Sequence, residues 1–189
     1  MDLREYFQIG LSVDAYEGLL EDDQRSLHRL YARRAQVDAD AVAALRSSPI
    51  QRALVITEPW CGDSLAIFPV VARLFVEAGC DLRIVRRDEH PDLIDRYLTN
   101  RGRAIPILIA MDASFREEFH WGPRPRPAQD LVLKHKEDVA AGRVEKADVH
   151  KRVRAFYARD CGRTIVSELL ERMRELRDDA RMLAEDSQN

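Results

Sequence analysis

The sequence has few cysteines and no strong excess of charge of either sign. It holds three cysteines in 189 residues, and 30 basic against 33 acidic side chains give a formal net charge of −3. An odd, small number of cysteines argues against a disulfide framework, so we expect free thiols in a reducing compartment, the cytoplasm. General nucleic-acid binding usually shows as a basic excess, which is missing here.

Long apolar runs are also missing, and we expect no secretory leader. The longest apolar run, 65–72, contains Pro69 and is far shorter than the ~18 residues of a membrane-spanning helix. The opening MDLREYFQIG lacks the order of a signal peptide, a basic stretch followed by an apolar one. We therefore expect no membrane partner. A hydrophobic content of 46% is enough for one sizeable core.

Hydrophobic spacing predicts helices that alternate with short strands. Apolar residues at helical intervals mark the helices, and β-branched runs mark the strands. The expected helices are 14–35, 38–46, 64–78, 90–100, 127–141 and 147–186, the last with a candidate break at 160–162. The expected strands are 52–58, 81–87, 104–112 and 113–121. This order predicts an α/β fold, in which a mixed sheet has helices on both faces.

The predicted elements divide into a central part and two helical extensions. The core is expected at 50–123, with an N-terminal helical extension 1–49 packed on it and a C-terminal helical extension 124–189, all in a single domain. The last helix carries one apolar stripe, which favours packing on its own domain and leaves a homodimer interface as the alternative. The stripe comprises Ile165, Val166, Leu169, Leu170, Met173, Leu176, Ala180 and Leu183.

The segment TEPWCGDSLAIFPV, residues 57–70, carries the candidate chemistry. Cys61 lies between a predicted strand and a predicted helix, where backbone N–H groups and the helix dipole favour a thiolate. The acid Asp63 opposes this effect, and the sequence does not decide which of the two prevails. Ser64 occupies the place of the second thiol in a Cys-x-x-Cys motif. Its hydroxyl can donate a hydrogen bond to the thiolate but cannot resolve a mixed disulfide.

A buried structural cysteine at a helix start is the alternative interpretation of Cys61. Three other features favour a reactive site. Pro69 lies inside the predicted helix, where it should bend the axis. Pro106 follows Ile105 at the start of a predicted strand, a place suited to a cis proline, and Gly122 follows the hairpin.

With these features the sequence resembles the thioredoxin superfamily. The resemblance covers about residues 50–123 and rests on the motif WCGDS together with Pro69, Pro106 and Gly122. More narrowly, the sequence looks like a bacterial branch of thioredoxin-like proteins with a Trp-Cys-Gly-Asp-Ser motif. That similarity rests on EPWCGDS, RRDEHPDLIDRYLTN, AIPILI and WGPRP. The resemblance implies a thioredoxin-like mixed sheet flanked by helices.

The resemblance also implies roles for individual residues. Cys61 would be the attacking thiol, with Ser64 beside it at the catalytic position, and the backbone of Ile105 would hold a substrate segment in an extended pose. The residues expected to contact the substrate are Trp60, Gly62, Asp63, Ile105 and Pro106.

The sequence departs from the thioredoxin pattern at three positions. Ser64 replaces the resolving cysteine, Val55 stands where many thioredoxins have a buried acid, and Ile84 stands in place of the lysine beside it. Losing both charges together is coherent, because neither is left buried alone. We interpret Cys80 and Cys161 as structural. Either could resolve a mixed disulfide only if its Cα lay within ~7 Å of that of Cys61.

The leading expectation is a monothiol thioredoxin-like protein that exchanges thiols and disulfides through Cys61. Its partner would be a protein disulfide or a low-molecular-weight thiol, with no bound cofactor and with glutathione or another small thiol as co-substrate. Arg86 and Arg87, at a strand end, could attract such an anion.

Two other functions stay open. One is a binding or chaperone-like module without turnover. The weaker one is an iron–sulfur carrier, from the Cys-Gly-x-Ser match to monothiol glutaredoxins. No zinc site is expected, since the cysteines lack paired spacing.

Overall fold

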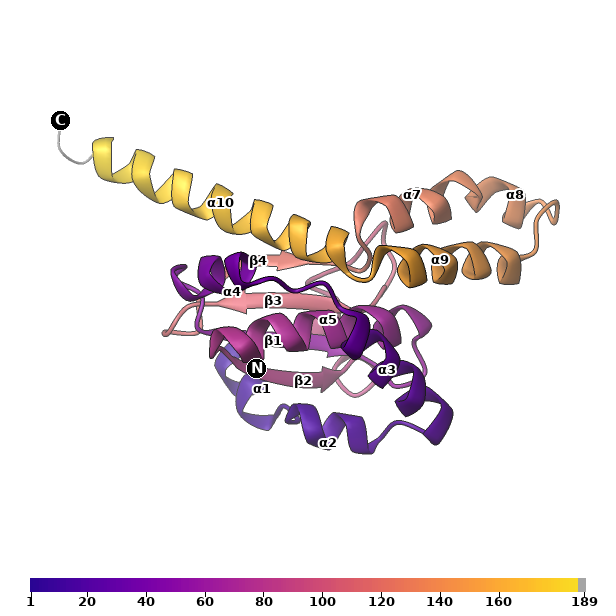
Figure 1. Ribbon diagram of the computed structural model, residues 1–189, viewed down its shortest axis with the longest axis horizontal. Coiled ribbons are helices and arrows are strands. Elements are labelled where there is room, and N and C mark those ends of the chain that lie inside the picture. Colours follow the sequence, from indigo (N-terminus) through magenta and orange to yellow (C-terminus); the bar gives the residue numbers. More distant parts are fainter. Residues whose placement is uncertain (187–189) are drawn as a thin grey trace.

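The structure is a computed structural model, and it describes residues 1–186. At residues 180 and 183–186 it describes the backbone but not the side chains. Its centre is one four-stranded sheet in the order β2-β1-β3-β4 (Figure 1). The strands are β1 (Arg52–Thr57), β2 (Asp81–Arg86), β3 (Ile107–Met111) and β4 (Glu117–Trp121). β1 pairs in parallel with β2 and antiparallel with β3, which pairs antiparallel with β4. The predicted mixed sheet is therefore confirmed.

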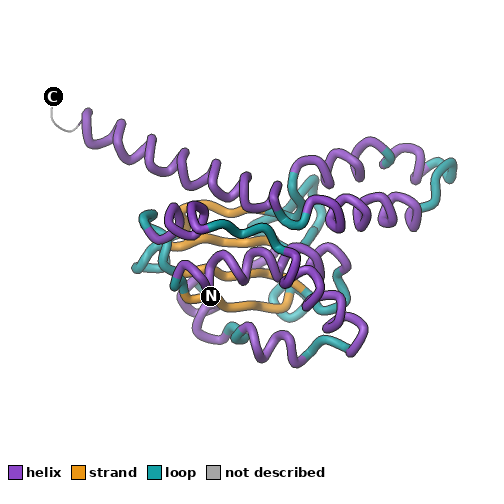
Figure 2. The backbone as a smooth tube through the Cα atoms, viewed as in Figure 1, coloured by secondary structure: helices purple, strands orange, loops and turns teal. Residues whose placement is uncertain are grey.

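Helices surround this sheet, and the strands lie at the centre of the molecule (Figure 2). The N-terminal helices are α1 (Leu3–Ile9), α2 (Val13–Gly18), α3 (Asp22–Arg34) and α4 (Ala39–Arg46). Two helices connect strands along the chain: α5 (Gly62–Ala78) lies between β1 and β2, and α6 (Pro91–Ile94) lies between β2 and β3. The C-terminal helices are α7 (Arg126–Lys134), α8 (Lys136–Ala140), α9 (Lys146–Asp160) and α10 (Arg163–Asp186), and α10 extends past the sheet (Figure 1).

Alternation along β1 sorts its side chains onto two faces of the sheet. Leu54 and Ile56 pack in a cluster with residues of α1 and α6. Ala53 and Val55 pack in a second cluster with residues of α4, α5 and α10. Because successive side chains of a strand point to opposite faces, an apolar strand of this kind needs helices on both sides. The expectation of helices on both faces is met.

The N-terminal region differs from the single helix expected at 14–35. The chain forms α2 and α3 instead, because a new helix begins at Glu21, whose backbone N–H donates to Gln24 in a capping box. A further helix, α1, was not predicted, and it begins with a capping box between Asp2 and Glu5. This short helix buries Tyr6 and Phe7 against the sheet.

The helix expected at 90–100 is reduced to the four residues of α6. The chain turns back after it through a bridge between Thr99 and Gly102. Asn100 and Arg101, at the tip of this turn, both have positive φ values, which no helix accommodates. The predicted helix was therefore too long.

The C-terminal helices join the core. α9 and α10 are separated at Cys161 and Gly162, which have φ values of 53° and 80°, where the break was expected. Of the apolar stripe on α10, Ile165, Val166, Leu169 and Met173 are buried in the cluster around α5. Leu170 and Leu176 pack on it, and the side chains of Ala180 and Leu183 lie outside the described part. Over residues 1–186, no helix is long and apolar enough to cross a bilayer.

Candidate functional site

Cys61 lies where β1 gives way to α5, and it is the N-cap residue of that helix. Its sulfur is 3.6 Å from the carbonyl oxygen of Ile105, and the Ile105–Pro106 peptide bond is cis. The helix start and this segment, far apart in the sequence, thus meet at the sulfur. The predicted neighbours Cys61, Ile105 and Pro106 lie together.

The Cys61 thiol is more enclosed than its position in the sequence suggests. The residue is 8% exposed, and burial raises the pKa of its thiol above the ordinary value. A hydrogen bond from the Ser64 hydroxyl to the thiolate form would lower the pKa, and the charge of Asp63 raises it, but neither effect exceeds burial. The sequence left open whether the helix start or Asp63 prevails at this thiol, and the largest effect on its pKa is a third one, the loss of hydration on burial.

Asp63, in the first turn of α5, has two partners from the C-terminal part of the chain. The Arg124 guanidinium is 2.5 Å from one carboxylate oxygen, and the Tyr157 hydroxyl donates to the other at 2.9 Å. Burial and the adjacent carboxylate together raise the pKa of Tyr157, so this hydroxyl stays protonated and continues to donate. The charge nearest to Cys61 is therefore compensated by Arg124.

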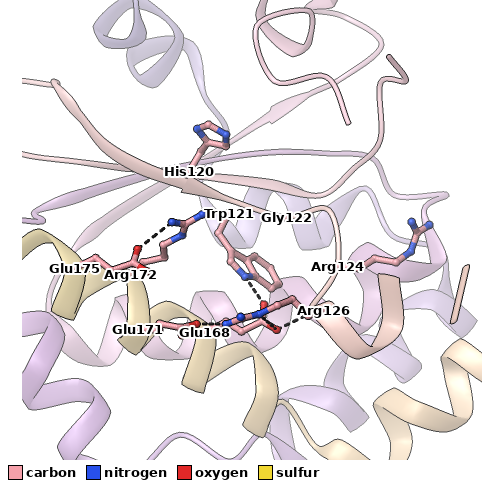
Figure 3. A pocket seen from close by; sticks show the side chains of 9 residues that line it. All are labelled: His120, Trp121, Gly122, Arg124, Arg126, Glu168, Glu171, Arg172 and Glu175. Carbon is pink, nitrogen blue, oxygen red and sulfur yellow. Dashed lines mark hydrogen bonds and ion pairs between the residues drawn. The ribbon is translucent and has the colours of Figure 1, made fainter. Parts of the chain in front are cut away.

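The segment that carries Arg124 is fixed at both ends. At its start, a Cβ added to Gly122 would lie 2.3 Å from the carbonyl oxygen of Pro106, so only glycine fits there. Further along, Glu168 of α10 accepts hydrogen bonds from the Trp121 indole at 2.8 Å and the Arg126 backbone N–H at 2.7 Å (Figure 3). In this view Arg124 points away from the Glu168 group. The anchored segment thus holds Arg124 for Asp63.

Trp60 forms the exposed side of the site. Its side chain is 55% exposed, and the Arg87 guanidinium lies 4.7 Å from the centre of the indole ring. Arg87 also donates to the carbonyl oxygen of Arg103, two residues before Ile105, at 3.1 Å. This cation–π contact joins the tryptophan to the segment that leads into Ile105. Arg87 is paired with Asp88 as well.

Glu58, directly after β1, is a buried acid that was not among the predicted site residues. It is 0% exposed, and it accepts from Arg86 at 3.2 Å and from the backbone N–H of Asp88 at 2.8 Å. These bonds satisfy the buried charge and join the end of β1 to the loop after β2. An acid at the end of the predicted strand 52–58 and three residues before Cys61 was the available signal.

Three buried hydroxyls surround the start of α5. Tyr16 Oη, Thr57 Oγ1 and Ser64 Oγ have no hydrogen-bond partner among the described residues. Burial raises the pKa of Tyr16 to about 12, so its hydroxyl stays neutral. Because Ser64 has no competing acceptor, its hydroxyl is available to the Cys61 sulfur. Gly62, the remaining predicted contact residue, is the first residue of α5, and a Cβ there would meet nothing within 4 Å.

Neither of the other cysteines can reach Cys61 within one chain. Cys80 lies 3.6 Å from the carbonyl oxygen of Ile50, at the opposite end of the six-residue strand β1, which spans about 20 Å. Gly162, next to Cys161, lies against Val70, nine residues along α5 from Cys61, a rise of roughly 13 Å. A disulfide needs a Cα separation below ~7 Å. All three thiols are free.

Metal-ligand geometry is missing as well. Within the described range, no three side chains of His, Cys, Asp or Glu come together as a metal site would require. The site consists of one thiol, one hydroxyl, a compensated acid and an exposed indole. Chemically, the Cys61 thiol can form a mixed disulfide, and neither Cys80 nor Cys161 is within reach to resolve it.

The mixed sheet, with Cys61 at the start of α5 and the Ile105–Pro106 segment opposite its sulfur, defines a thioredoxin-like α/β protein. The family described as Thioredoxin matches residues 10–143, more than half of the chain, and the chain belongs to that family. The match extends past the expected core of 50–123 into the N-terminal helices and as far as α8. The narrower branch with the Trp-Cys-Gly-Asp-Ser motif stays a prediction.

Two solved structures share the fold over nearly the whole chain. A protein of unknown function from Pseudomonas aeruginosa has a TM-score of 0.69 at 19% identity, covering 93% of this chain and 98% of its own. An HIV epitope-scaffold protein has a TM-score of 0.68 at 16% identity, covering 93% and 99%. At these identities the likeness concerns the fold alone. No match was found among the curated proteins.

Proposed function

We propose that the protein is a cytoplasmic monothiol that exchanges thiols and disulfides through Cys61. The Cys61 thiolate attacks one sulfur of a substrate disulfide, forms a mixed disulfide and releases the other sulfur as a thiolate. An external thiol of the glutathione class then attacks the mixed disulfide. That step forms a new external disulfide and regenerates the Cys61 thiol, so each cycle exchanges partners without net oxidation.

One observation carries this proposal. The Cys61 sulfur lies at a helix start, beside the carbonyl of Ile105, and no second thiol of the chain is within disulfide reach. The exposed Trp60 offers an apolar surface for a substrate segment, whereas the Ile105 segment, 4% exposed, would offer its strand-like edge only after local opening. Ser64 supports thiolate formation, and its hydroxyl leaves resolution to an external thiol.

Mass spectrometry after exposure to oxidised glutathione tests the proposal. We expect a glutathione adduct on Cys61 that dithiothreitol removes, forming faster as the pH rises through 9, because burial raises the pKa of this thiol. The variant Cys61→Ser removes the thiol and should form no such adduct. The double variant Cys80→Ser/Cys161→Ser is the matched control and should keep it. Adducts confined to Cys80 or Cys161 would exclude the proposed role.

Replacement of the hydroxyl by a thiol tests the monothiol part separately. In the variant Ser64→Cys we expect oxidation to link positions 61 and 64, since this spacing is that of a Cys-x-x-Cys motif. The adduct with glutathione should then disappear without an added thiol. A variant that keeps a stable adduct would show that position 64 cannot resolve it, and that the geometry differs from that of a dithiol exchanger.

A binding module without turnover is the second candidate, and the enclosure of Cys61 favours it. A thiol that is 8% exposed and has a raised pKa is a weak nucleophile at neutral pH, whereas Trp60 beside it is open to a partner. Cys61→Ala separates the two functions. Full binding of a partner segment by this variant favours the module, and loss of exchange together with loss of binding favours the monothiol.

A further inference from the structure

A second cleft lies between α3 and α9, and it shares one residue, Tyr157, with the Asp63 contact of the Cys61 site. Both helices pack on α5, and the space left between them has a volume of about 320 Å³. Apolar and aromatic side chains form most of its walls, namely Leu27, Leu30, Tyr31, Ala155, Tyr157 and Ala158. Leu30 is 40% exposed, so the apolar wall is open to solvent.

Three cations line this cleft, and no acid does. They are Arg34, Lys151 and Arg154. Arg34 donates to the carbonyl oxygen of Ala158 at 3.0 Å and so joins α3 to α9. Among the side chains that the structure describes, no ion pair joins Lys151 or Arg154 to a carboxylate. Acidic side chains outnumber basic ones in this chain, 33 to 30, so composition does not explain a lining with cations alone.

We propose that this cleft binds a small amphipathic anion, a carboxylate with a short aliphatic tail. The tail would lie along Leu27 and Leu30, and the carboxylate would be held by Lys151 and Arg154. Binding pockets for small molecules are mainly apolar with a few polar groups, at volumes of ~300–1,000 Å³. The cleft lies at the lower end of that range, which suits a small ligand.

The carboxylate of this ligand matches the cations of the cleft, and its aliphatic tail matches the apolar wall. An inorganic anion would match the cations but leave the apolar wall in water. A neutral aliphatic molecule would cover the wall and leave two unpaired cations beside it. An acid with an aliphatic tail satisfies both, through apolar burial and charge-assisted hydrogen bonds.

The thiol of Cys161, which also lines the cleft, reports occupancy. Octanoate is the probe, and alkylation of Cys161 by iodoacetamide is followed by mass spectrometry on the whole chain. We expect octanoate to slow this alkylation several-fold and saturably. The rate at Cys80, which lies beside Ile50 and outside the cleft, should not change. Octylammonium, with the same tail and the opposite charge, should give no protection.

Charge reversal on the cleft supplies the matched variants. Lys151→Glu/Arg154→Glu should abolish protection by octanoate, whereas Arg159→Glu, on the same helix but outside the lining, should keep it. If the double variant unfolds, the single change Lys151→Gln must weaken octanoate binding in calorimetry. Equal protection by octylammonium, or full protection of the double variant, overturns the proposal. The outcome is independent of exchange chemistry, because Cys61→Ser should bind octanoate equally.

Discussion

At the scale of single residues, the Asp63 carboxylate lies between the Cys61 thiol and two groups from the C-terminal part of the chain. Its charge raises the pKa of Cys61, and the Arg124 guanidinium at 2.5 Å compensates part of that charge. Tyr157 holds the carboxylate in place through a hydrogen bond. The contact is therefore both structural and electrostatic, and variants can separate the two contributions.

Removal of either charge of this pair should move the pKa of Cys61 in opposite directions. Asp63→Asn removes the negative charge and should lower the pKa, so alkylation of Cys61 near neutral pH becomes faster. Arg124→Gln leaves the carboxylate uncompensated and should raise the pKa, so alkylation becomes slower. The pH dependence of iodoacetamide labelling at Cys61 measures both variants.

The opposite directions of the two pKa shifts distinguish an electrostatic role of this ion pair from a purely structural one. Both variants break the same contact, and each should destabilise the fold by about 1–3 kcal/mol through the buried groups left unpaired. A purely structural role would therefore change the labelling of Cys61 in the same direction in both variants. Such a result would contradict the electrostatic role of Asp63.

His28 provides a second prediction at this scale, because it is a base buried in its neutral form. Its side chain is 3% exposed and lies against Phe68, and burial lowers its pKa from 6.5 to about 4. Arg29 lowers the pKa further, whereas Glu17, 3.5 Å from Nδ1, favours the charged form but does not outweigh burial.

The stability of the fold should therefore decline in acid through His28. Below about pH 6.5 the unfolded chain binds a proton that the folded protein excludes until about pH 4. The free energy of unfolding should fall across that window by up to about 3 kcal/mol. Urea unfolding at several pH values measures this loss. His28→Phe keeps a ring and removes the titration, so an equal loss in that variant would exclude His28 as its cause.

At the scale of elements, the contact between the end of β4 and the segment before β3 positions the site. Gly122 has a φ of 130°, and a Cβ there would lie 2.3 Å from the Pro106 carbonyl oxygen. Gly122→Ala should therefore destabilise the fold by at least about 2 kcal/mol and shift the segment beside Cys61. Denaturant unfolding measures the first effect, and the labelling rate of Cys61 measures the second.

The matched control for this change is Gly142→Ala. Gly142 also has a positive φ, 68°, but a Cβ added there would meet nothing within 4 Å. It carries the conformational strain without the clash, and we expect a loss of about 1 kcal/mol and an unchanged labelling rate. Equal losses in both variants would mean that backbone strain, and not the approach to Pro106, dominates at Gly122.

Local patterns predicted the elements whose signals are local. β1 has a β-branched run of strand length, and α5 has an apolar face and a glycine at its end with a φ of 82°, so both were predictable within two residues. Residues 90–100 have a proline at a helix start and a stop signal, which predict one helix. The helix nevertheless ends early, and the chain turns back through the bridge between Thr99 and Gly102. Tertiary pairing of that kind has no short-range signature.

The candidate site divides in the same way. Cys61 and Pro106 were predictable because the resemblance to thioredoxins fixes their spacing. The partners of Asp63 were not, since Tyr157 is 94 residues away and Arg124 lies in a proline-rich stretch outside every predicted helix and strand. The burial of the Cys61 thiol also depends on the packing of elements that are distant in the sequence. A short motif carries no information about that packing.

At the scale of the whole molecule, the C-terminal helices and the sheet share one hydrophobic core. Val153 and Tyr157 of α9 and Val166 and Leu169 of α10 belong to the same buried cluster as α5. In Figure 1, α10 crosses the sheet beside β4 before it extends past it. The region 50–123 alone would therefore expose a large part of the surface that α5 buries.

Truncation after residue 145, which removes α9 and α10, should thus abolish cooperative folding. Each fully buried apolar side chain contributes about 1.5–3 kcal/mol, and several are lost, against a total stability of about 5–15 kcal/mol for ordinary domains. The truncated chain should bind hydrophobic dyes and lose near-ultraviolet circular dichroism. Truncation after Arg177 is the control, because it keeps the buried Met173 and removes a stretch that begins with the exposed Asp178 and Asp179. That chain should unfold cooperatively, and a cooperative transition in the shorter chain would mean that the sheet and α5 form a complete core without α9 and α10.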